Sequence, residues 1–372
     1  MSHSDAVLTT VLPEPGQEHV PTPAGPVARL IDGGDLDCGS GLLLLITRNM
    51  RRLADGGHLG IRSAEPSVTV DLPAWADLVG HSVAVQHAES EQGPWWFVVE
   101  KSGAPATVFT TGRSTPVGER LWVYTNFDCN LACDYCCAQS SPKAEARRFP
   151  VETARAAFEE FAALGGKEVF LTGGEPFMHP DLDGLVEAAA GLERTVLTNA
   201  MILGRGRRRE ILEGLDRSVA LQVSLDSATP DLHDRQRGAG TWGKALDGIE
   251  LAASLGFRVR IAATLYDEDP AGVQALHARL DQLDIAPEDR VIRPVAAEGF
   301  ADQGIHVSID NLEPEPTLTV DGAWWHPVAV TNPHMRIADH PLPVSEVIGV
   351  MRDTVAVQDA AAATGREVFR CA

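Results

Sequence analysis

The sequence predicts an α/β protein with a small N-terminal α/β domain followed by a larger region of six βα repeats. Three observations predict this: short apolar β-like runs recur along the chain, helical segments lie between them, and a stretch rich in Gly, Thr, Ser and Pro separates the two series. A chain of 372 residues has room for two or three domains. We expect a tail over 1–27, a first domain over 28–101, a linker over 102–120, a second domain over 121–296 and an extension over 297–372.

The first domain is expected to be a two-layer sandwich of the βαβαβ type. The apolar run Leu42–Ile46 predicts one buried face of a helix. The residues before this domain are polar and rich in proline, without the charged and apolar regions of a signal peptide, so they predict a loose tail. Strands are predicted over 27–31, 59–62 and 95–100, and helices over 41–53 and 73–79.

The second domain is expected to be a partial (βα)6 barrel. Six βα repeats with short turns predict a parallel sheet, and in such sheets the chemistry lies at the carboxyl ends of the strands. The extension predicts loops and strands with a closing helix over 344–362. Strands of the barrel are predicted over 121–125, 168–172, 195–198, 219–225, 258–265 and 291–295, with helices between them such as 152–164 and 244–255.

Charge and composition exclude two classes of partner. The formal net charge of −21 argues against a protein that binds nucleic acid or an anionic membrane through a broad basic surface. The chain has no run approaching the ~20 apolar residues of a membrane span. We therefore expect a cytoplasmic protein without nucleic-acid or membrane partners.

The cysteines point to metal or redox chemistry. Four of the six lie close together directly after the first strand of the second domain, and Cys129, Cys133 and Cys136 have the spacing Cys-x3-Cys-x2-Cys. Three thiolates on one loop can hold three irons of a cubane cluster and leave the fourth iron open to a small molecule. The alternative is structural zinc, which normally takes four ligands; Cys137 would have to be the fourth, and adjacent cysteines are poorly placed to bind one ion. The spacing favours the cluster.

The second domain resembles the radical S-adenosylmethionine (SAM) superfamily. The cysteine motif, with Tyr135 as its aromatic residue, has the form of that family's signature. Three further segments follow in order at successive predicted strand ends and resemble the family's GGE, TN and SLD motifs. They are Gly173-Gly174-Glu175, Thr198-Asn199 and Ser224-Leu225-Asp226, the last followed by Arg237.

The resemblance implies the cofactors and the roles of these residues. It implies one [4Fe–4S] cluster on the three cysteines, SAM on the open iron, reductive cleavage of SAM, and hydrogen abstraction from a small-molecule or peptide substrate. It also implies a flavodoxin- or ferredoxin-type electron donor. For SAM it implies Tyr135 beside the adenine, Gly173 and Gly174 allowing close backbone approach, Glu175 at the ammonium group, Ser224 and Arg237 at the ribose and carboxylate, and Asn199 and Asp226 within the same site.

The first domain resembles the TusA/SirA sulfur carriers. The resemblance rests on Leu36-Asp37-Cys38, on residues 55–61 and on residues 71–75. It places Cys38 at the persulfide-carrying cysteine of that family's Cys-Pro-x-Pro loop, yet here the loop reads Cys38-Gly39-Ser40-Gly41, without either proline. Two interpretations stay open: Cys38 is catalytic and exchanges sulfur with a donor or acceptor protein, or the domain is a docking module.

The extension resembles a SPASM-type C-terminal region that has lost its cysteines. The resemblance lies in residues 316–327, and only Cys371 remains beyond them, so we expect no auxiliary cluster. The leading function is radical hydrogen abstraction, with or without sulfur transfer. The alternatives are a redox-neutral radical SAM epimerase or rearrangement enzyme, and a non-catalytic sulfur-relay or scaffold protein.

Overall fold

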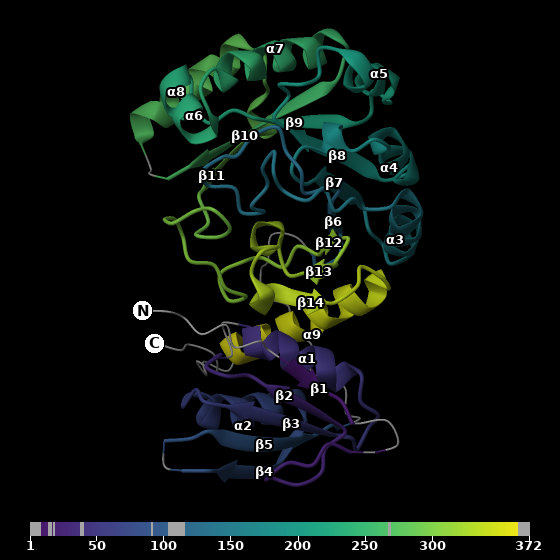
Figure 1. Cartoon of the computed structure of the whole chain (residues 1–372), viewed down its shortest axis with the longest axis vertical. Coiled ribbons are helices and arrows are strands. Elements are labelled where there is room, and N and C mark those ends of the chain that lie inside the picture. Colours follow the sequence, from purple (N-terminus) through teal and green to yellow (C-terminus); the bar gives the residue numbers. More distant parts are fainter. Residues whose placement is uncertain are drawn as a thin grey trace. The chain divides into compact units, whose positions relative to one another are not determined.

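The computed structural model describes residues 9–13, 17, 19–37, 41–90, 92–102, 116–266 and 269–363. The chain forms two compact units, shown in Figure 1. The small unit comprises residues 1–114, 308–314 and 348–372, and the large unit comprises residues 115–307 and 315–347. Each unit is described by itself.

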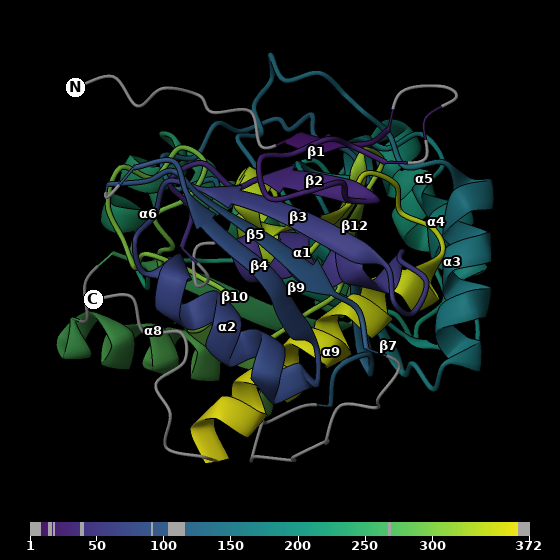
Figure 2. The same ribbon diagram turned by 90° about the horizontal axis from the view of Figure 1, so that it is seen from below.

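The small unit is built on a five-stranded sheet with the order β1-β2-β3-β5-β4, which Figure 2 shows face on. Only β2 and β3 are parallel, and the other neighbouring pairs are antiparallel. The strands β2, β3 and β5 lie within two residues of their predicted positions, whereas β1 and β4 were not predicted, and β1 falls in the expected tail. The strands are β1 (Thr9–Val11), β2 (Arg29–Asp32), β3 (His58–Ser63), β4 (Ser82–Ala88) and β5 (Trp95–Glu100).

Helix α1 (Leu43–Arg51) of the small unit is buried on all sides rather than on one face. Its polar residues Thr47, Arg48 and Asn49 are buried together with the leucines before them. A helix that is buried all round is a core element, which explains the continuous apolar run that the sequence shows here. Helix α2 (Val68–Val79) packs against β4.

The large unit is built on a nine-stranded sheet. Its first six strands are parallel and lie in sequence order, as predicted, and Figure 1 shows them following a curve with helices on its outer side. The helices are α3 (Val151–Ala163), α4 (Leu182–Ala188), α5 (Gly206–Gly214), α6 (Pro230–Arg237), α7 (Thr241–Ser254) and α8 (Pro270–Gln282). The six strands are β6 (Arg120–Tyr124), β7 (Glu168–Thr172), β8 (Glu193–Thr198), β9 (Ala220–Ser224), β10 (Arg258–Leu265) and β11 (Arg290–Pro294).

The predicted extension continues this sheet beyond β6. Strand β12 (Thr317–Thr319) pairs with β6 in parallel, and β13 (Gly322–Trp324) and β14 (Arg336–Ala338) follow in antiparallel order. Strands β11 and β14 are therefore the two edges, and the sheet does not close into a barrel. The last helix, α9 (Val344–Ala363), begins where Glu160 of α3 accepts hydrogen bonds from the backbone N–H groups of Val344 and Ser345 at 2.8 and 3.0 Å.

The core of the large sheet consists of strand residues that are buried on both faces. Leu121 and Val123 of β6, and Val169 and Leu171 of β7, are fully buried on one face, and Trp122 and Phe170 on the other face are 7% and 3% exposed. Burial of both faces is expected for parallel strands covered by helices, and it holds the strand ends in fixed positions. Among the helices that the structure describes, none is both long and apolar enough to cross a membrane.

Candidate functional site

The cysteine motif lies on the loop that leaves the carboxyl end of β6, here called the cysteine loop (residues 125–140). Backbone hydrogen bonds fix this loop along its length: Cys129 N–H donates to Ser141 O at 3.2 Å, and Asp134 N–H donates to Gln236 O at 3.0 Å. Cys136 O accepts from Phe300 N–H at 3.1 Å. The segments at Ser141, Gln236 and Phe300 thus hold the loop in place.

Gly173 and Gly174 allow the chain leaving β7 to pass directly against the cysteine loop. A Cβ atom on Gly173 would collide with the carbonyl oxygen of Asn126, and one on Gly174 would collide with that of Asp128. Gly173 also has a φ of +145°, which disfavours other residues. We expected these glycines to admit a ligand; the close approach that the structure shows is to the protein backbone.

The cysteine thiols are held in surroundings that disfavour the free thiolate. Burial, with a smaller contribution from the negative charge of Glu175, raises the pKa of Cys129 to about 12. Burial raises the pKa of Cys133 to about 11, against the opposing charge of Arg237. A metal that binds these sulfurs must displace their protons, and metal binding is therefore favoured by rising pH.

Backbone N–H groups point at two of the sulfurs. Leu131 N–H donates to Cys129 Sγ and Ser140 N–H donates to Cys136 Sγ, both at 3.4 Å. Hydrogen bonds to ligand sulfurs are one of the ways in which proteins tune iron–sulfur clusters. In the described part of the chain, no three His, Cys, Asp or Glu side chains are grouped as they would be around a single metal ion. The donor set consists of three cysteine sulfurs, which is the ligand type of an iron–sulfur cluster, so the residues present fit that group.

Glu175 is a buried carboxylate that joins the ends of β7 and β8. Its Oε1 accepts from the Phe177 N–H at 3.1 Å and from the Thr198 hydroxyl at 2.7 Å, and its Oε2 accepts from the Asn199 N–H at 2.8 Å. Burial raises its pKa to about 7, although these hydrogen bonds oppose the shift. The predicted site residues Glu175 and Asn199 are thus brought together, but both oxygens of Glu175 are already used within the protein.

Asn199 connects this carboxylate to the cysteine loop. Its side-chain amide donates to Asn130 Oδ1 at 2.9 Å and lies 3.9 Å from Cys129 Sγ. Its backbone N–H is the one that Glu175 accepts. A change at Glu175 would therefore be transmitted to the first cysteine through one residue.

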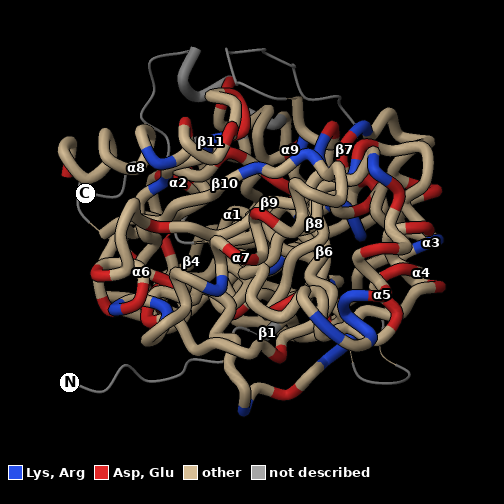
Figure 3. Tube along the Cα trace, turned by 90° about the horizontal axis from the view of Figure 1, so that it is seen from above, with Lys and Arg blue, Asp and Glu red and all other residues tan. Residues whose placement is uncertain are grey.

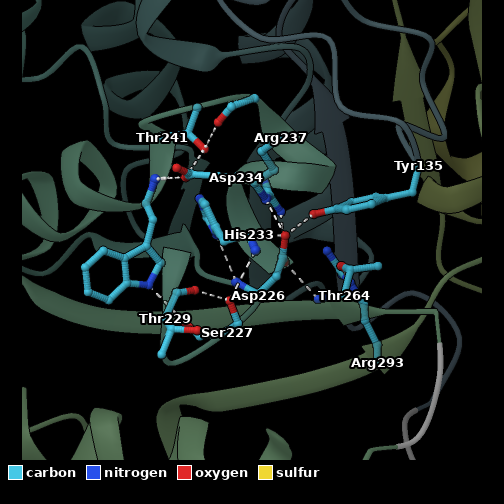
Figure 4. A network of polar contacts seen from close by, with 12 residues as sticks. Tyr135, Asp226, Ser227, Thr229, His233, Asp234, Arg237, Thr241, Thr264 and Arg293 are labelled. Carbon is cyan, nitrogen blue, oxygen red and sulfur yellow. Dashed lines mark hydrogen bonds and ion pairs between the residues drawn. The ribbon is translucent and has the colours of Figure 1, made fainter. Parts of the chain in front are cut away.

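A second buried carboxylate, Asp226, lies at the end of β9 and forms the network drawn in Figure 4. Arg237 donates to both of its oxygens, from Nε at 2.6 Å and from Nη2 at 3.2 Å. The Tyr135 hydroxyl donates to Oδ2 at 2.8 Å, and the Thr264 N–H donates to Oδ1 at 3.1 Å. Burial raises the pKa of Asp226, but the charge and hydrogen bonds of Arg237 outweigh it, and the net pKa lies below the usual value. The guanidinium also lies 5.2 Å from the centre of the Tyr135 ring.

His233 of α6 supports this network as a neutral imidazole. Burial and, to a smaller extent, the positive charge of Arg237 together lower its pKa to about 4. Its Nδ1 accepts the backbone N–H of Asp226 at 3.2 Å. Neighbouring Asp234 accepts the backbone N–H of Gly240 at 2.7 Å and that of Trp242 at 2.8 Å, which fixes the start of α7. The sequence drew attention to this segment but gave His233 no role.

An open pocket of about 500 Å³ borders the cysteine loop at Cys133. Tyr266 follows directly after β10, and Phe300 belongs to the chain that packs against Cys136 O. Sequence analysis did not select either residue; the position of Tyr266 at a strand end was the signal that could have found it. The lining residues are Ala132, Cys133, Asp134, Tyr266, Phe300, Asp302 and Gln303.

The remaining predicted residues lie in different places. Ser224 is half-buried at the end of β9, and its hydroxyl has no hydrogen-bond partner among the residues described. Cys137 lies 3.9 Å from the Tyr124 hydroxyl. Trp324 is buried in a cluster with Tyr124 and Phe127 beneath the cysteine loop. Cys38 and Cys371 lie outside the described residues.

Basic residues gather at the start of α5, which Figure 3 shows as a short blue stretch. Arg207 pairs with Asp183 at 2.7 Å, and Arg209 pairs with Glu213 at 2.7 Å. Both pairs are exposed to solvent. The basic stretch is therefore a solvated start of a helix.

Comparison with known proteins identifies the central part of the chain. Residues 123–276 match the family model described as the Radical SAM superfamily. The PqqA peptide cyclase of Ruegeria pomeroyi is 42% identical over 111 residues, which cover 29% of each chain. The GTP 3',8-cyclase of Aeromonas hydrophila subsp. hydrophila is 35% identical over 148 residues, covering 37% of this chain and 42% of that protein. The matches therefore span less than half the length of these relatives.

Among solved structures, a histidine-tagged form of anSMEcpe with bound AdoMet resembles this chain in fold. The match covers 63% of this chain and 79% of the other, with a TM-score of 0.50 and 12% identity. The matched family segment begins in β6 and ends in α8, and it contains the cysteine loop, Glu175, Asp226 and Arg237. Residues 123–276 of this chain therefore match the Radical SAM superfamily model, and the relatives that they match are named as enzymes.

Proposed function

We propose that this protein is a radical SAM enzyme that holds one [4Fe–4S] cluster on Cys129, Cys133 and Cys136. The observation that carries the proposal is the cysteine loop itself, which lies at the carboxyl end of a parallel sheet and is held there by backbone hydrogen bonds to other segments of the chain. When bound, the cluster would supply the electron that cleaves SAM into methionine and a 5′-deoxyadenosyl radical, which takes a hydrogen atom from the substrate.

The residues around the loop would bind and orient SAM. The Tyr135 ring is held by its hydrogen bond to Asp226 and by the guanidinium of Arg237, which suits a residue that positions an adenine. The Ser224 hydroxyl has no partner within the described residues, so it is available to a ribose. We assign Glu175, Asn199, Asp226 and Arg237 to holding the walls of this site, because their polar groups are used within the protein.

The substrate is proposed to be a small molecule or a peptide. The open pocket beside Cys133 is the space in which it would lie, and one matched relative is named for a peptide that it cyclises. A flavodoxin- or ferredoxin-type protein is the proposed electron donor. Participation of Cys38 in sulfur transfer, and a redox-neutral epimerisation without it, are the two forms of the reaction that a Cys38→Ser variant distinguishes.

The experiment that tests the proposal is anaerobic reconstitution with iron and sulfide, followed by SAM and dithionite and an assay for 5′-deoxyadenosine. We expect about four irons and four sulfides per chain and formation of 5′-deoxyadenosine. The Cys133→Ala variant should fall to the level of a protein-free control. The Cys137→Ala variant is the matched control, because it removes a neighbouring thiol outside the proposed ligand set, and it should keep its cluster.

Two outcomes would contradict the proposal. A wild-type protein that loads its cluster but never cleaves SAM, even with candidate substrates present, would favour the relay or scaffold function. A preparation that retains one zinc ion and no iron would favour structural zinc. A Cys137→Ala variant that loses the metal as completely as Cys133→Ala would also support that second result.

A further inference from the structure

Arg293 lies at the carboxyl end of β11, on the same side of the large sheet as the network of Figure 4. It pairs in register with Thr264 of β10, and its Nε donates to the Thr264 hydroxyl at 3.3 Å. Thr264 in turn donates its backbone N–H to Asp226. Figure 4 shows the side chain of Arg293 directed toward Thr264 and the region of Tyr135 and Asp226. The guanidinium is therefore placed at the end of the sheet that holds the proposed SAM site.

Arg293 has no carboxylate partner among the described residues, a property that it shares with Arg194, which lies near the amino end of β8 and donates to the Ser218 hydroxyl at 2.6 Å. Its hydrogen bond to Thr264 uses one of the five N–H donors of a guanidinium. A half-buried cation without a counter-ion is unfavourable, and the usual resolution is pairing. By contrast, Arg120, Arg258, Arg260 and Arg290 have a carboxylate oxygen at 3.0, 2.7, 3.7 and 2.6 Å.

Arg293 interacts electrostatically with Tyr124 of β6, with Cys137 of the cysteine loop and with His326. None of these three side chains is a carboxylate, so none supplies a counter-ion of the kind that the paired arginines have. Burial lowers the pKa of His326 to about 3, so its imidazole is uncharged near neutral pH.

His326 adds a second hydrogen-bond donor to this region. Its Nδ1 accepts the Val328 N–H at 3.2 Å. Since the imidazole is neutral, its hydrogen is on Nε2. No acceptor for that hydrogen lies among the described residues. The region thus combines a fixed positive charge with a neutral donor, which is the chemistry of an oxyanion site rather than of a cation site.

The surroundings of Arg293 lie near the cysteine loop and near the pocket in which we propose that the substrate lies. Cys137 is adjacent to the proposed cluster ligand Cys136. Side chains alternate along a strand, so Tyr266, which lines the open pocket, continues the face of β10 that carries Thr264. Arg293 does not itself line the pocket; it contacts Thr264, two positions before the lining residue Tyr266 on the same face of β10.

We propose that Arg293 binds a carboxylate or phosphate oxyanion of the substrate and so selects for anionic substrates. Arg is suited to this role because its planar fork matches two oxygens of either group. The inference rests on the proposed function only in calling this ligand a substrate. The binding of the anion is measured without any turnover.

The test is isothermal titration of the cluster-loaded protein, saturated with SAM under anaerobic conditions, with pyrophosphate and separately with succinate. The wild type should bind at least one of them, and the better probe identifies phosphate or carboxylate as the preferred group. Arg293→Gln should weaken that binding by about tenfold or more, since a charge-assisted pair is lost. Arg155→Gln is the matched control: it removes an exposed arginine of α3, and its binding should equal that of the wild type.

Three results would overturn the proposal. The first is a wild type that binds neither anion, and the second is an Arg293→Gln variant that binds as tightly as the wild type. The third is an Arg293→Gln variant that loses affinity for SAM itself in equilibrium dialysis, which would place Arg293 in the SAM site. If circular dichroism shows that Arg293→Gln does not fold, Arg293→Lys replaces it. Lysine keeps the charge but lacks the fork, so binding should weaken by several-fold, and unchanged binding would again overturn the proposal.

Failure of this inference can be told apart from failure of the proposed function. A protein that forms 5′-deoxyadenosine but shows no Arg293-dependent anion binding would keep the function and lose the oxyanion site. A protein that binds anions through Arg293 but never cleaves SAM would keep the oxyanion site and contradict the proposed function.

Discussion

Glu175 and Asp226 are two buried carboxylates at strand ends of the same sheet, and they are stabilised in opposite ways. Glu175 accepts hydrogen bonds from two backbone N–H groups and one hydroxyl. Asp226 accepts from the guanidinium of Arg237 and from the Tyr135 hydroxyl and a backbone N–H. The pKa of Glu175 is raised to about 7 by burial, whereas Arg237 holds that of Asp226 below its usual range against the effect of burial.

The comparison shows that hydrogen bonds from neutral groups offset the burial-induced rise in the pKa of a carboxylate less than a neighbouring cation does. The stability contributed by Asp226 is present above the ordinary pKa of an aspartate and is lost as the pH falls through its lowered folded value. The contribution of Glu175 has the opposite sign: it is fully present below the ordinary pKa of a glutamate and is lost as the pH rises through about 7. The stability contributed by Asp226 is therefore lost in acid, whereas that contributed by Glu175 is lost as the pH rises.

The largest expected effect comes from removing the cation of the Asp226 network. Arg237→Met leaves Asp226 buried without a counter-ion, so the free energy of unfolding should fall by about 3–5 kcal/mol at pH 7. Urea unfolding of the metal-free protein measures this change. The double variant Asp226→Asn, Arg237→Met should recover much of the loss, because no buried charge remains.

Arg258→Met is the matched control for this prediction. Arg258 is 61% exposed, and its partner Asp289 keeps Arg260 at 3.8 Å. Its removal should lower the free energy of unfolding by less than about 1 kcal/mol. Equal losses in Arg237→Met and Arg258→Met would show that Asp226 does not depend on Arg237.

An intermediate effect is expected from the titration of Glu175. Between pH 5 and pH 8 the raised pKa should lower the free energy of unfolding of the metal-free wild type by about 2 kcal/mol. Glu175→Gln carries no charge at either pH, so this part of the pH dependence should be absent from it. The variant also loses a hydrogen bond at every pH, which shifts its stability without changing the slope.

The measurement is urea unfolding of both proteins at several pH values across that range. Parallel curves for wild type and variant would mean that Glu175 is ionised in the folded protein throughout. In that case the pKa of Glu175 would not be raised, and the two carboxylates would not differ in the way described above.

The smallest expected effect comes from the Tyr135 hydroxyl. Tyr135→Phe removes one hydrogen bond from Asp226, which keeps Arg237 and the Thr264 N–H, so the free energy of unfolding should fall by about 1 kcal/mol. Tyr266→Phe is the control: its hydroxyl bonds to the more exposed Asp134, and its loss should be smaller. If Tyr266→Phe lowered the free energy of unfolding more than Tyr135→Phe does, the prediction that the Tyr135 hydroxyl contributes more to stability would be wrong.

The fold of the large unit could be predicted because its strands and helices carry strong local signals. The six predicted parallel strands occur within two residues of their expected positions. Strands β12 to β14 were not located, since each is only three residues long and depends on pairing with distant partners. Strand β1 was not predicted for the same reason. Its residues pair with β2, and nothing in a polar, proline-rich stretch indicates that pairing.

The site was predictable as a set of residues but not as a set of contacts. The motifs gave Glu175, Asp226 and Arg237, whose expected contacts with groups of SAM stay predictions. Their hydrogen bonds within the protein were not predicted. The close approach of Gly174 to the cysteine loop was not predicted either, because such an approach between two loops has no local signal beyond the glycine itself. Pairings across strand ends depend on side-chain directions that spacing alone does not fix.

The small unit draws its residues from widely separated parts of the sequence. Arg51 of α1 donates to Asp353 of α9 at 2.5 Å, and 302 positions separate the two residues. During synthesis, the five-stranded sheet and α1 leave the ribosome first, but residues 348–363 emerge only after the large unit has been made. The small unit therefore lacks part of its surface until nearly the whole chain has been translated.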